Sequence, residues 1–354
     1  MKALITAGGH GTRLRPITHT QNKHLIPIAN KPILNYALEY VRDAGITEVG
    51  IITNKDGSEV KDVYGDGSAF GLKLTYIPQE APLGLAHAIR IAEPFIGDEP
   101  FIYYLGDNII VGGIKKFVEE FRNNGTNCHL VLAKVTDPER FGVPEIKDGR
   151  IVLIEEKPSR PKSNFAVTGI YLYDKHIFEA VNNIEPSARG ELEISDAHQY
   201  LIDGGFSVSY SEITGWWKDT GKPADLLEAN RLVLDNIKTD IKGCVDSSSL
   251  VTGRAIVEQD AEIINSNIRG PVIIGKGAKI ENAYIGPYTS VAYNCSIRNS
   301  EVEFSIILEN CSIHNQSIRL ESSLLGKDVS ILKANSKPFT NRFIVGDQSY
   351  LEIR

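Results

Sequence analysis

A loop near the amino terminus combines glycines with a hydroxyl and a basic side chain. Its chemistry-bearing residues are Gly8, Gly9, Gly11, Thr12 and Arg13, and an apolar segment runs directly into them. Glycines let backbone N–H groups approach a phosphate chain closely, and an arginine supplies positive charge. The composition of this loop therefore predicts that it binds phosphate groups.

Two familiar phosphate-binding loops do not fit this segment. A Walker loop needs Gly-Lys-Ser/Thr after four intervening residues, but Gly11 is followed by Thr12 and Arg13. A dinucleotide-binding loop needs a third glycine three places after Gly11, where this chain has Leu14. The segment is therefore a phosphate loop of another kind.

Two aspartates have the chemistry to bind a divalent cation. Asp107 follows the apolar segment Phe101–Leu105, and Asp219 follows a pair of tryptophans. Mg²⁺ binds triphosphates through one or two carboxylates and water. An aspartate in such a place also serves as a turn or capping residue, so these residues alone leave both roles open.

Alternating strand-like and helix-like segments must position these residues. The strand-like segments are Ala3–Thr6, Val49–Thr53, Leu74–Ile77, Phe101–Leu105 and His129–Val135. The helix candidates between them include Pro32–Ala44, Leu85–Ala92 and Ile114–Asn123. This alternation predicts an α/β domain whose mostly parallel sheet has helices on both faces and binds ligands at the carboxyl ends of the strands.

The pattern changes near Lys238–Asp246. Beyond it, branched residues recur every five or six positions, as in Ile263, Ile268, Ile274, Ile280, Ile285 and Val291. Such a period predicts stacked coils, with an ordinary antiparallel β domain as the alternative. The spacing resembles the hexapeptide repeat of left-handed β-helices, and the hand comes from that resemblance. We expect domains at 1–238 and 239–354, with Phe343–Arg354 as a closing strand or cap.

The bulk composition limits the class of protein. The 354 residues are 42% hydrophobic and 23% charged, which fits a soluble globular chain of two domains. The net charge of -7 argues against nucleic-acid binding, and no apolar run has the ~20 residues of a membrane helix. The four cysteines have no CxxC spacing. Together with the missing signal peptide, this predicts reduced thiols in a cytoplasmic protein.

Two motifs in order carry a resemblance to a known family. The segment Gly8–Leu14 and the following Lys23-His24-Leu25-Ile26-Pro27 resemble the signature motifs of the sugar-phosphate nucleotidylyltransferases. The resemblance implies a Rossmann-like catalytic domain in which the glycine loop holds a nucleoside triphosphate. It also implies that Arg13 and Lys23 act on the phosphates, that Gln79 and Gly84 meet the nucleotide base, and that His24 occupies a variable place.

The same resemblance assigns the metal and the sugar phosphate. Asp107 and Asp219 fall where the family binds Mg²⁺, which makes them the expected metal ligands. Arg13, Lys23, Asp107 and Asp219 are then the expected catalytic residues. The expected sugar-phosphate residues are Gly142, Glu156, Lys157, Thr168 and Arg189.

One branch of the family is closest. Glu155-Glu156-Lys157-Pro158, Val167–Tyr171 and Arg189–Asp196 look like the thymidylyltransferases, in the long form that carries a left-handed β-helix. This implies dTTP and glucose 1-phosphate as substrates and dTDP-glucose as product.

Three alternatives stay open. A sister enzyme would use UTP in place of dTTP. A bifunctional enzyme would add acetyltransferase activity, for which His314 and Asn315 are the only hint. A non-catalytic sensor or scaffold would have lost motif residues. The flat faces of stacked coils also predict a homo-oligomer.

Overall fold

A computed structural model describes residues 1–333, 337–338 and 340–353. Its contacts form two compact units. The first unit contains Met1–His10, Asn22–Leu25 and Ile33–Asp219, and the second contains Gly11–Gln21, Ile26–Pro32 and Thr220–Arg354. The division of the sequence into domains at 1–238 and 239–354 stays a prediction.

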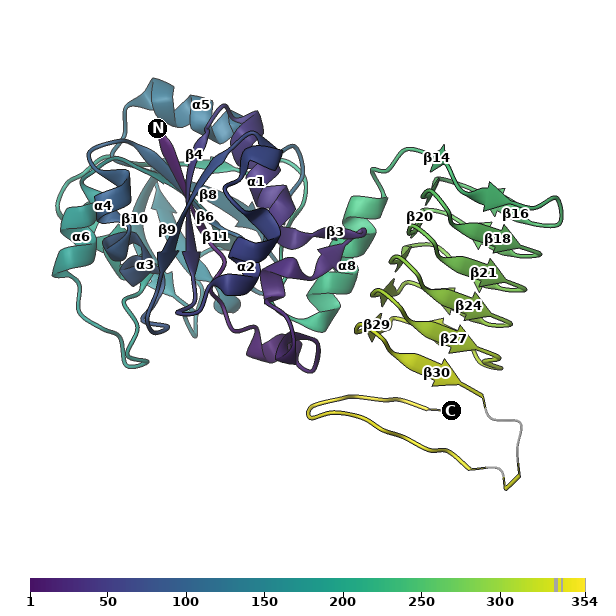
Figure 1. The fold of residues 1–354 in the computed structure, drawn as a ribbon. Coiled ribbons are helices and arrows are strands. Elements are labelled where there is room, and N and C mark those ends of the chain that lie inside the picture. Colours follow the sequence, from purple (N-terminus) through teal and green to yellow (C-terminus); the bar gives the residue numbers. More distant parts are fainter. Residues whose placement is uncertain (334–336, 339, 354) are drawn as a thin grey trace. The chain divides into compact units, whose positions relative to one another are not determined.

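The first unit is built on a nine-stranded sheet in which β10, β9, β11, β6, β1, β4 and β5 follow one another, with β8 joining β11 to β12 (Figure 1). These strands are β1 (Lys2–Thr6), β4 (Glu48–Thr53), β5 (Lys73–Pro78), β6 (Phe101–Leu105), β8 (Cys128–Lys134), β9 (Gly142–Lys147), β10 (Arg150–Glu156), β11 (Phe165–Tyr173) and β12 (Val208–Glu212). Pairing is parallel through β6, β1, β4 and β5, as predicted. Strand β11 runs antiparallel to β6 and β8.

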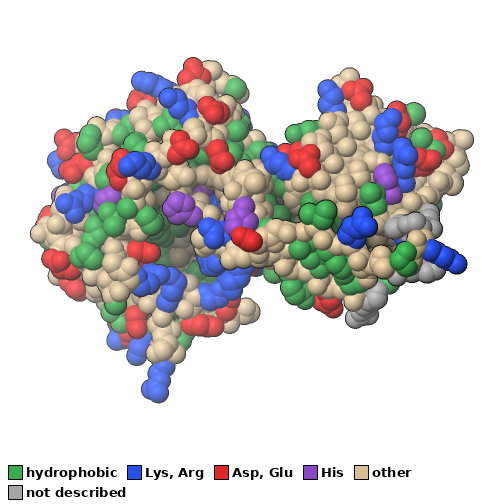
Figure 2. Space-filling view, turned by 60° about the horizontal axis from the view of Figure 1, so that its bottom comes forward, with side chains coloured by type: hydrophobic (Ala, Val, Ile, Leu, Met, Phe, Trp, Pro, Cys, Tyr) green, Lys and Arg blue, Asp and Glu red, His purple; other side chains and the backbone are tan. Residues whose placement is uncertain are grey.

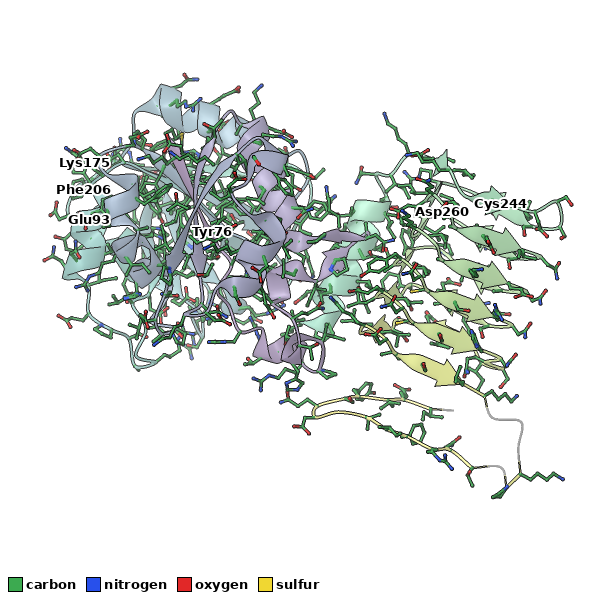
Figure 3. The ribbon with its side chains drawn as sticks, viewed as in Figure 1. Tyr76, Glu93, Lys175, Phe206, Cys244 and Asp260 are labelled. Carbon is green, nitrogen blue, oxygen red and sulfur yellow. The ribbon has the colours of Figure 1, made fainter. Side chains whose placement is uncertain are left out.

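Helices cover both faces of this sheet, as the alternating pattern predicts. They are α1 (Ile33–Asp43), α2 (Ser58–Tyr64), α3 (Leu85–Ile91), α4 (Glu93–Ile96), α5 (Lys115–Asn124), α6 (Ile177–Asn183) and α7 (Ile194–Asp203). Successive side chains of β1 point to opposite faces of the sheet, as in any β-strand. Leu4 packs into the core under α3 and α6, whereas Ala3 and Ile5 pack into the core under α1 and α5. Figure 3 draws the side chains of both layers as sticks.

Three parallel sheets in the second unit form a β-helix. The strands of successive coils are β14 (Asp240–Ile241), β15 (Cys244–Val245), β16 (Leu250–Thr252), β17 (Ala255–Val257), β18 (Glu262–Ile264), β19 (Asn267–Arg269), β20 (Val272–Ile274), β21 (Lys279–Glu281), β22 (Tyr284–Ile285), β23 (Thr289–Val291), β24 (Ser296–Arg298), β25 (Glu301–Glu303), β26 (Ile306–Ile307), β27 (Ser312–His314), β28 (Leu320–Glu321), β29 (Leu324–Leu325) and β30 (Ser330–Leu332). Each strand from β14 to β27 pairs in parallel with its counterpart in the next coil, which contradicts the antiparallel alternative. The stacks are consistent with the left-handed coil that the resemblance implies.

Branched side chains explain this repeat. Ile263, Ile280, Ile297 and Ile313 stand in register on neighbouring coils, and each is almost completely buried. Each coil therefore buries its apolar residues only against the next coil, which is the property of a solenoid.

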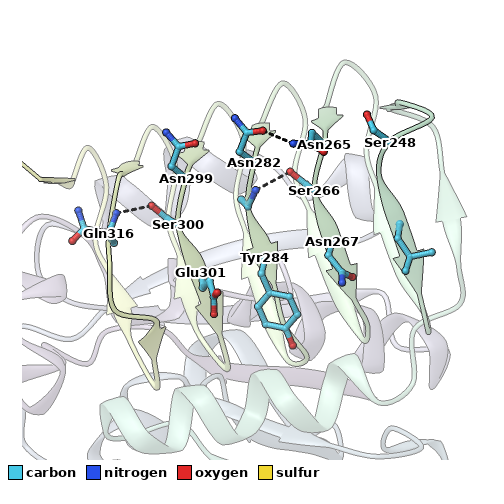
Figure 4. A pocket seen from close by; sticks show the side chains of 12 residues that line it. Ser248, Asn265, Ser266, Asn267, Asn282, Tyr284, Asn299, Ser300, Glu301 and Gln316 are labelled. Carbon is cyan, nitrogen blue, oxygen red and sulfur yellow. Dashed lines mark hydrogen bonds between the residues drawn. The ribbon is translucent and has the colours of Figure 1, made fainter.

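A shallow groove of about 540 Å³ runs along one corner of the β-helix (Figure 4). Asparagines stack there, and Asn265 Nδ2 donates to Asn282 Oδ1 at 2.7 Å. Several of these asparagines have positive φ, including Asn265, Asn282 and Asn299. Asparagine tolerates this left-handed conformation better than most residues, so its recurrence at the corner has a local backbone cause.

The sequence predicts a closing strand or cap for the C-terminal segment, and the described residues of this segment form no strand. Its turn matches a β-helix corner, because Ser349 N donates to Gly346 O at 3.3 Å as Ala278 N donates to Gly275 O at 3.1 Å. Residues 343–353 nevertheless pair with no strand among the described residues, and Ile344 is 95% exposed. Arg354 lies outside the described residues.

Helix α8 (Pro223–Leu234) packs in the second unit through one buried side chain. Asn230 Oδ1 accepts hydrogen bonds from Ala29 N at 2.8 Å and from Ser290 Oγ at 2.7 Å, and its Nδ2 donates to Tyr288 O at 3.0 Å. Ala29 lies between the short strands β2 (Pro27–Ile28) and β3 (Lys31–Pro32). This amide therefore joins the helix, the β2–β3 hairpin and the β-helix.

We predict that Asn230→Leu destabilises the second unit. The substitution would leave the Ala29 N–H, the Ser290 hydroxyl and the Tyr288 carbonyl without this partner, at a cost of about 2–4 kcal/mol. Urea unfolding followed by circular dichroism measures the effect. The exposed Asn236, just beyond the same helix, provides the control Asn236→Leu. Equal unfolding midpoints for the two variants would contradict the assignment.

Candidate active site

The glycine loop begins where β1 ends, and two of its glycines allow close backbone packing. A Cβ on Gly8 would lie 2.6 Å from Asn54 N. A Cβ on Gly9 would lie 2.8 Å from Lys23 Cε. Any side chain at these positions would displace the neighbouring strand or the lysine.

Lys23 and Asp107 form an ion pair at the same edge of the sheet. Lys23 opens a 3₁₀ turn, Lys23–Leu25, and Asp107 follows β6. Burial raises the pKa of Asp107, but the electrostatic interactions with Lys23 and His24 and the hydrogen bond from Lys23 together outweigh burial and lower the pKa to about 2. Asp107 is thus a carboxylate anion at neutral pH, which is the form that binds cations.

Asn22 and His24 hold the lysine turn in place. The sequence marked His24 only as a variable position of the motif, and it did not mark Asn22. Asn22 Nδ2 donates to Ala7 O at 2.8 Å, which ties the turn to the chain just beyond β1. Asn22 Oδ1 accepts from His24 N and lies 2.9 Å from His24 Nδ1. Burial, and then the Lys23 charge, lowers the pKa of His24 to about 3, so the ring is neutral. The apolar Leu25 and Ile26 beside it are the signal that could have marked this histidine as buried.

Asp219 lies opposite Asn108 in a second, two-stranded sheet. Strand β13 (Trp217–Asp219) pairs antiparallel with β7 (Asn108–Ile110). Asn108 Nδ2 donates to Asp107 Oδ1 at 3.0 Å, and Trp217 Nε1 donates to Asn108 Oδ1 at 2.6 Å. One asparagine therefore links the two aspartate positions.

The electrostatics around Tyr171 also indicate that the acidic residues converge. Burial raises the pKa of Tyr171, and the charges of Glu156, Asp107 and Asp219 raise it further. No cluster of three or more His, Cys, Asp or Glu side chains that could hold a metal occurs among the described residues. Two carboxylates fit a divalent ion whose remaining ligands are substrate phosphates and water.

The expected sugar-phosphate residues gather around Glu156. Ser195 Oγ donates to Glu156 Oε2 at 2.8 Å, and Lys157 Nζ lies 3.1 Å from Glu156 Oε1. Arg189 Nη2 lies 4.0 Å from the same carboxylate. A Cβ on Gly142 would lie 3.0 Å from Ser195 Oγ, so glycine leaves the room that this cluster needs.

Two of the expected residues have strong partners within the protein. The buried Thr168 donates its hydroxyl proton to Val131 O at 2.8 Å, across the irregular pairing of β11 with β8. Its hydroxyl oxygen can still accept. Arg189 forms a two-pronged ion pair with Glu193, which raises the pKa of the guanidinium. Arg189 is thereby held beside Glu156.

The expected base-binding residues lie between β5 and α3. Gly84 has φ of 100°, and a Cβ there would lie 2.4 Å from Leu192 O. Gln79 Nε2 donates to Gly84 O at 3.2 Å. The chain thus requires glycine at this bend, and the bend fixes the amide of Gln79.

Arg13 lies in a segment of the second unit. Gly11 has φ of 59° and precedes a 3₁₀ turn, Thr12–Leu14. Thr18 Oγ1 donates to Gly11 O at 2.7 Å, while Arg13 is exposed. Figure 2 shows Lys, Arg and His side chains on one face of the protein.

Two features lie outside this site. The four cysteines are free, and Cys244 lies on the β-helix (Figure 3). None of the helices in the described parts of the chain is long and apolar enough to cross a membrane.

Comparison with known proteins places the chain in a family. The nucleotidyl transferase family model matches residues 2–236. A glucose-1-phosphate thymidylyltransferase of Streptomyces griseus is 50% identical over 354 residues, covering 100% of this chain and 99% of its own. The Streptomyces antibioticus enzyme of the same name is 50% identical over 356 residues, covering 100% of both chains.

A solved structure agrees with these relatives. It comes from Bacillus anthracis and is provisionally assigned as a glucose-1-phosphate thymidylyltransferase. It matches with a TM-score of 0.64 at 42% identity, over 68% of this chain and 97% of that chain. This chain therefore belongs to the nucleotidyl transferase family and, within it, to the glucose-1-phosphate thymidylyltransferases.

Proposed function

We propose that this protein transfers the thymidylyl group of dTTP to glucose 1-phosphate, giving dTDP-glucose and pyrophosphate. Enzymes of the family act on a nucleoside triphosphate and a sugar phosphate, and they generally use a divalent metal. The observation that carries the proposal is the Lys23–Asp107 ion pair beside the glycine loop. The residue after Asp107, Asn108, pairs with Asp219 in the two-stranded sheet. Identity of 50% over the full chain to enzymes of that name supports the choice of substrates.

The reaction needs charge neutralisation more than proton transfer. A phosphate oxygen of glucose 1-phosphate forms a bond to the α-phosphorus of dTTP, and the bond from that phosphorus to the pyrophosphate oxygen breaks. The attacking oxygen is already an anion at neutral pH, so no general base is required. The obstacle is repulsion between two anions, so positioning and fixed positive charge supply the catalysis.

The residues around the glycine loop would bind the triphosphate. We assign the backbone of Gly8, Gly9, Gly11 and Thr12 to the phosphate chain. Arg13 would stabilise charge on the α-phosphate and on the leaving pyrophosphate, and Lys23 would hold a phosphate close to the reacting centre. Asp107 and Asp219 would bind Mg²⁺, which, when bound, neutralises phosphate charge.

The Glu156 cluster would bind the second substrate. Lys157 and Arg189 carry the positive charge that a sugar phosphate requires, and Glu156 is the acceptor for a sugar hydroxyl. Because Ser195 and Arg189 already orient Glu156, this carboxylate would need little reorganisation on binding.

The alternatives differ in how the structure bears on them. Uracil differs from thymine by one methyl group, worth about 1–3 kcal/mol in an apolar pocket, so some use of UTP is expected.

His314 Nε2 lies 2.9 Å from Ser296 Oγ, and Asn315 Oδ1 accepts from Asn299 Nδ2 at 2.7 Å. These bonds give both residues a role within the β-helix. Acetyltransferase activity stays an untested alternative, and a homo-oligomer stays a prediction. A sensor or scaffold is disfavoured because Arg13, Lys23, Asp107 and Asp219 are all present.

The direct test is pyrophosphate release with Mg²⁺, glucose 1-phosphate and each of dTTP, UTP, ATP, CTP and GTP. We expect the highest kcat/KM with dTTP and weaker use of UTP. A preference for another nucleotide would keep the mechanism and move the protein to a sister activity. No release with any of the five would contradict the proposal for glucose 1-phosphate.

A second prediction concerns the metal ligands. Asp219→Asn removes one fixed charge from the reacting centre, which typically costs about 3–4 kcal/mol of barrier, or two to three decades of rate. We expect the variant to lose that much kcat while keeping its urea midpoint and secondary structure. The exposed Asp148, in the turn between β9 and β10, gives the matched control Asp148→Asn. Wild-type turnover by Asp219→Asn would remove this residue from the mechanism.

A further inference from the structure

A histidine in helix α3 contacts the amide that the proposed function places against the base. Gln79 Nε2 lies 3.2 Å from Gly84 O and 3.0 Å from His87 Nδ1. A carbonyl oxygen can only accept a hydrogen bond, so the Gln79 atom that faces Gly84 has to be the amide nitrogen. The ring nitrogen that faces the same amide nitrogen is then also an acceptor, and His87 carries its proton on Nε2.

The charge state of His87 agrees with this role. Burial lowers the pKa of His87, and the neighbouring Arg90 charge lowers it further. The imidazole is therefore neutral at pH 7, which leaves Nδ1 with the lone pair that accepts from Gln79.

The Gly84 carbonyl is itself fixed. Ala88 N donates to it at 3.4 Å in the first turn of α3. The loop on either side is tied to Leu192, since Leu192 N donates to Leu83 O at 2.8 Å and Ala86 N donates to Leu192 O at 3.2 Å. Two acceptors in fixed places thus determine which way the Gln79 amide points.

We infer that His87 is a specificity-determining positioning residue, which keeps the Oε1 atom of Gln79 turned away from Gly84 and His87 and toward the nucleotide base. The inference rests on the proposed function, in which Gln79 meets the base. An acceptor at that place selects a pyrimidine with an N–H at ring position 3. Thymine and uracil carry this N–H, whereas cytosine presents a lone pair there and would face the Gln79 oxygen without a proton between them.

Two variants separate the acceptor from the bulk of the ring. His87→Phe keeps a ring of similar size but removes one of the two acceptors. Only Gly84 O then opposes rotation of the Gln79 amide, so the rotated form that offers its nitrogen to the base becomes more populated. His87→Asn restores an acceptor oxygen close to the place of Nδ1. We expect His87→Phe to reduce the ratio of kcat/KM for dTTP over dCTP about tenfold, the worth of one hydrogen bond, and His87→Asn to keep most of it.

The readout is a ratio that general damage would not change. The ratio of dTTP over dUTP should stay at its wild-type value in both variants, because both bases carry the same N–H. The half-buried His176, outside this loop, gives the control His176→Phe. A wild-type dTTP over dCTP ratio in His87→Phe, or an equal loss of activity with all three nucleotides, would overturn the inference.

Failure of the proposed function would look different. If the wild-type protein released no pyrophosphate with dTTP, the proposed function would be wrong whatever His87 does. Calorimetric Kd values for dTTP and dCTP with wild type, His87→Phe and His87→Asn would then carry the test. Lost discrimination in His87→Phe alone would support the role of His87, and equal discrimination in all three proteins would overturn it.

Discussion

The ion pair between Lys23 and Asp107 is the interaction on which the arrangement of the first unit's active-site edge depends. Two charges that are largely removed from water are tolerated only when they are paired and hydrogen-bonded. Their neighbours meet this demand. Asn22 ties the lysine turn to the end of β1, Asn108 donates to Asp107, and Gly9 leaves the space that the lysine chain occupies. Removing either charge would leave the other one buried without compensation, so the pair also fixes where substrate charge can be accommodated.

Sheet topology brings the two charges together. Strands β1 and β6 are parallel neighbours, with Thr6 opposite Leu105, so the chain leaves both strands at the same edge. The sequence predicts that the loops after β1 and β6 meet at this edge, because both apolar segments are followed by glycine and polar residues. The pairing of β13 with β7, which brings Asp219 to Asn108, does not follow from it. That contact joins residues more than a hundred positions apart, and no local pattern encodes such a partner.

The residues whose roles sequence reasoning missed share a physical cause. Asn22, His24 and His87 act through hydrogen bonds to backbone or to another side chain, and those bonds depend on distances that the folded chain alone defines. In the sequence they resemble ordinary turn and helix residues. The glycines were found more easily, because a missing Cβ is a property of the residue itself. Gly8, Gly9 and Gly84 all lie where a Cβ would meet another part of the chain at less than 3.0 Å.

The C-terminal segment forms a turn but no strand among the described residues. Gln348 has φ of 64°, the same left-handed conformation as Gly277 and Asn294 at earlier corners of the β-helix. A turn of four residues closes on its own hydrogen bond, so the local sequence suffices to specify it. A strand needs a neighbour for its N–H and C=O groups, and the described residues supply none to positions 343–353. The sequence predicted a closing strand or cap here but could not show whether a strand would find a partner, because in a solenoid each strand is stabilised only by the adjacent coil.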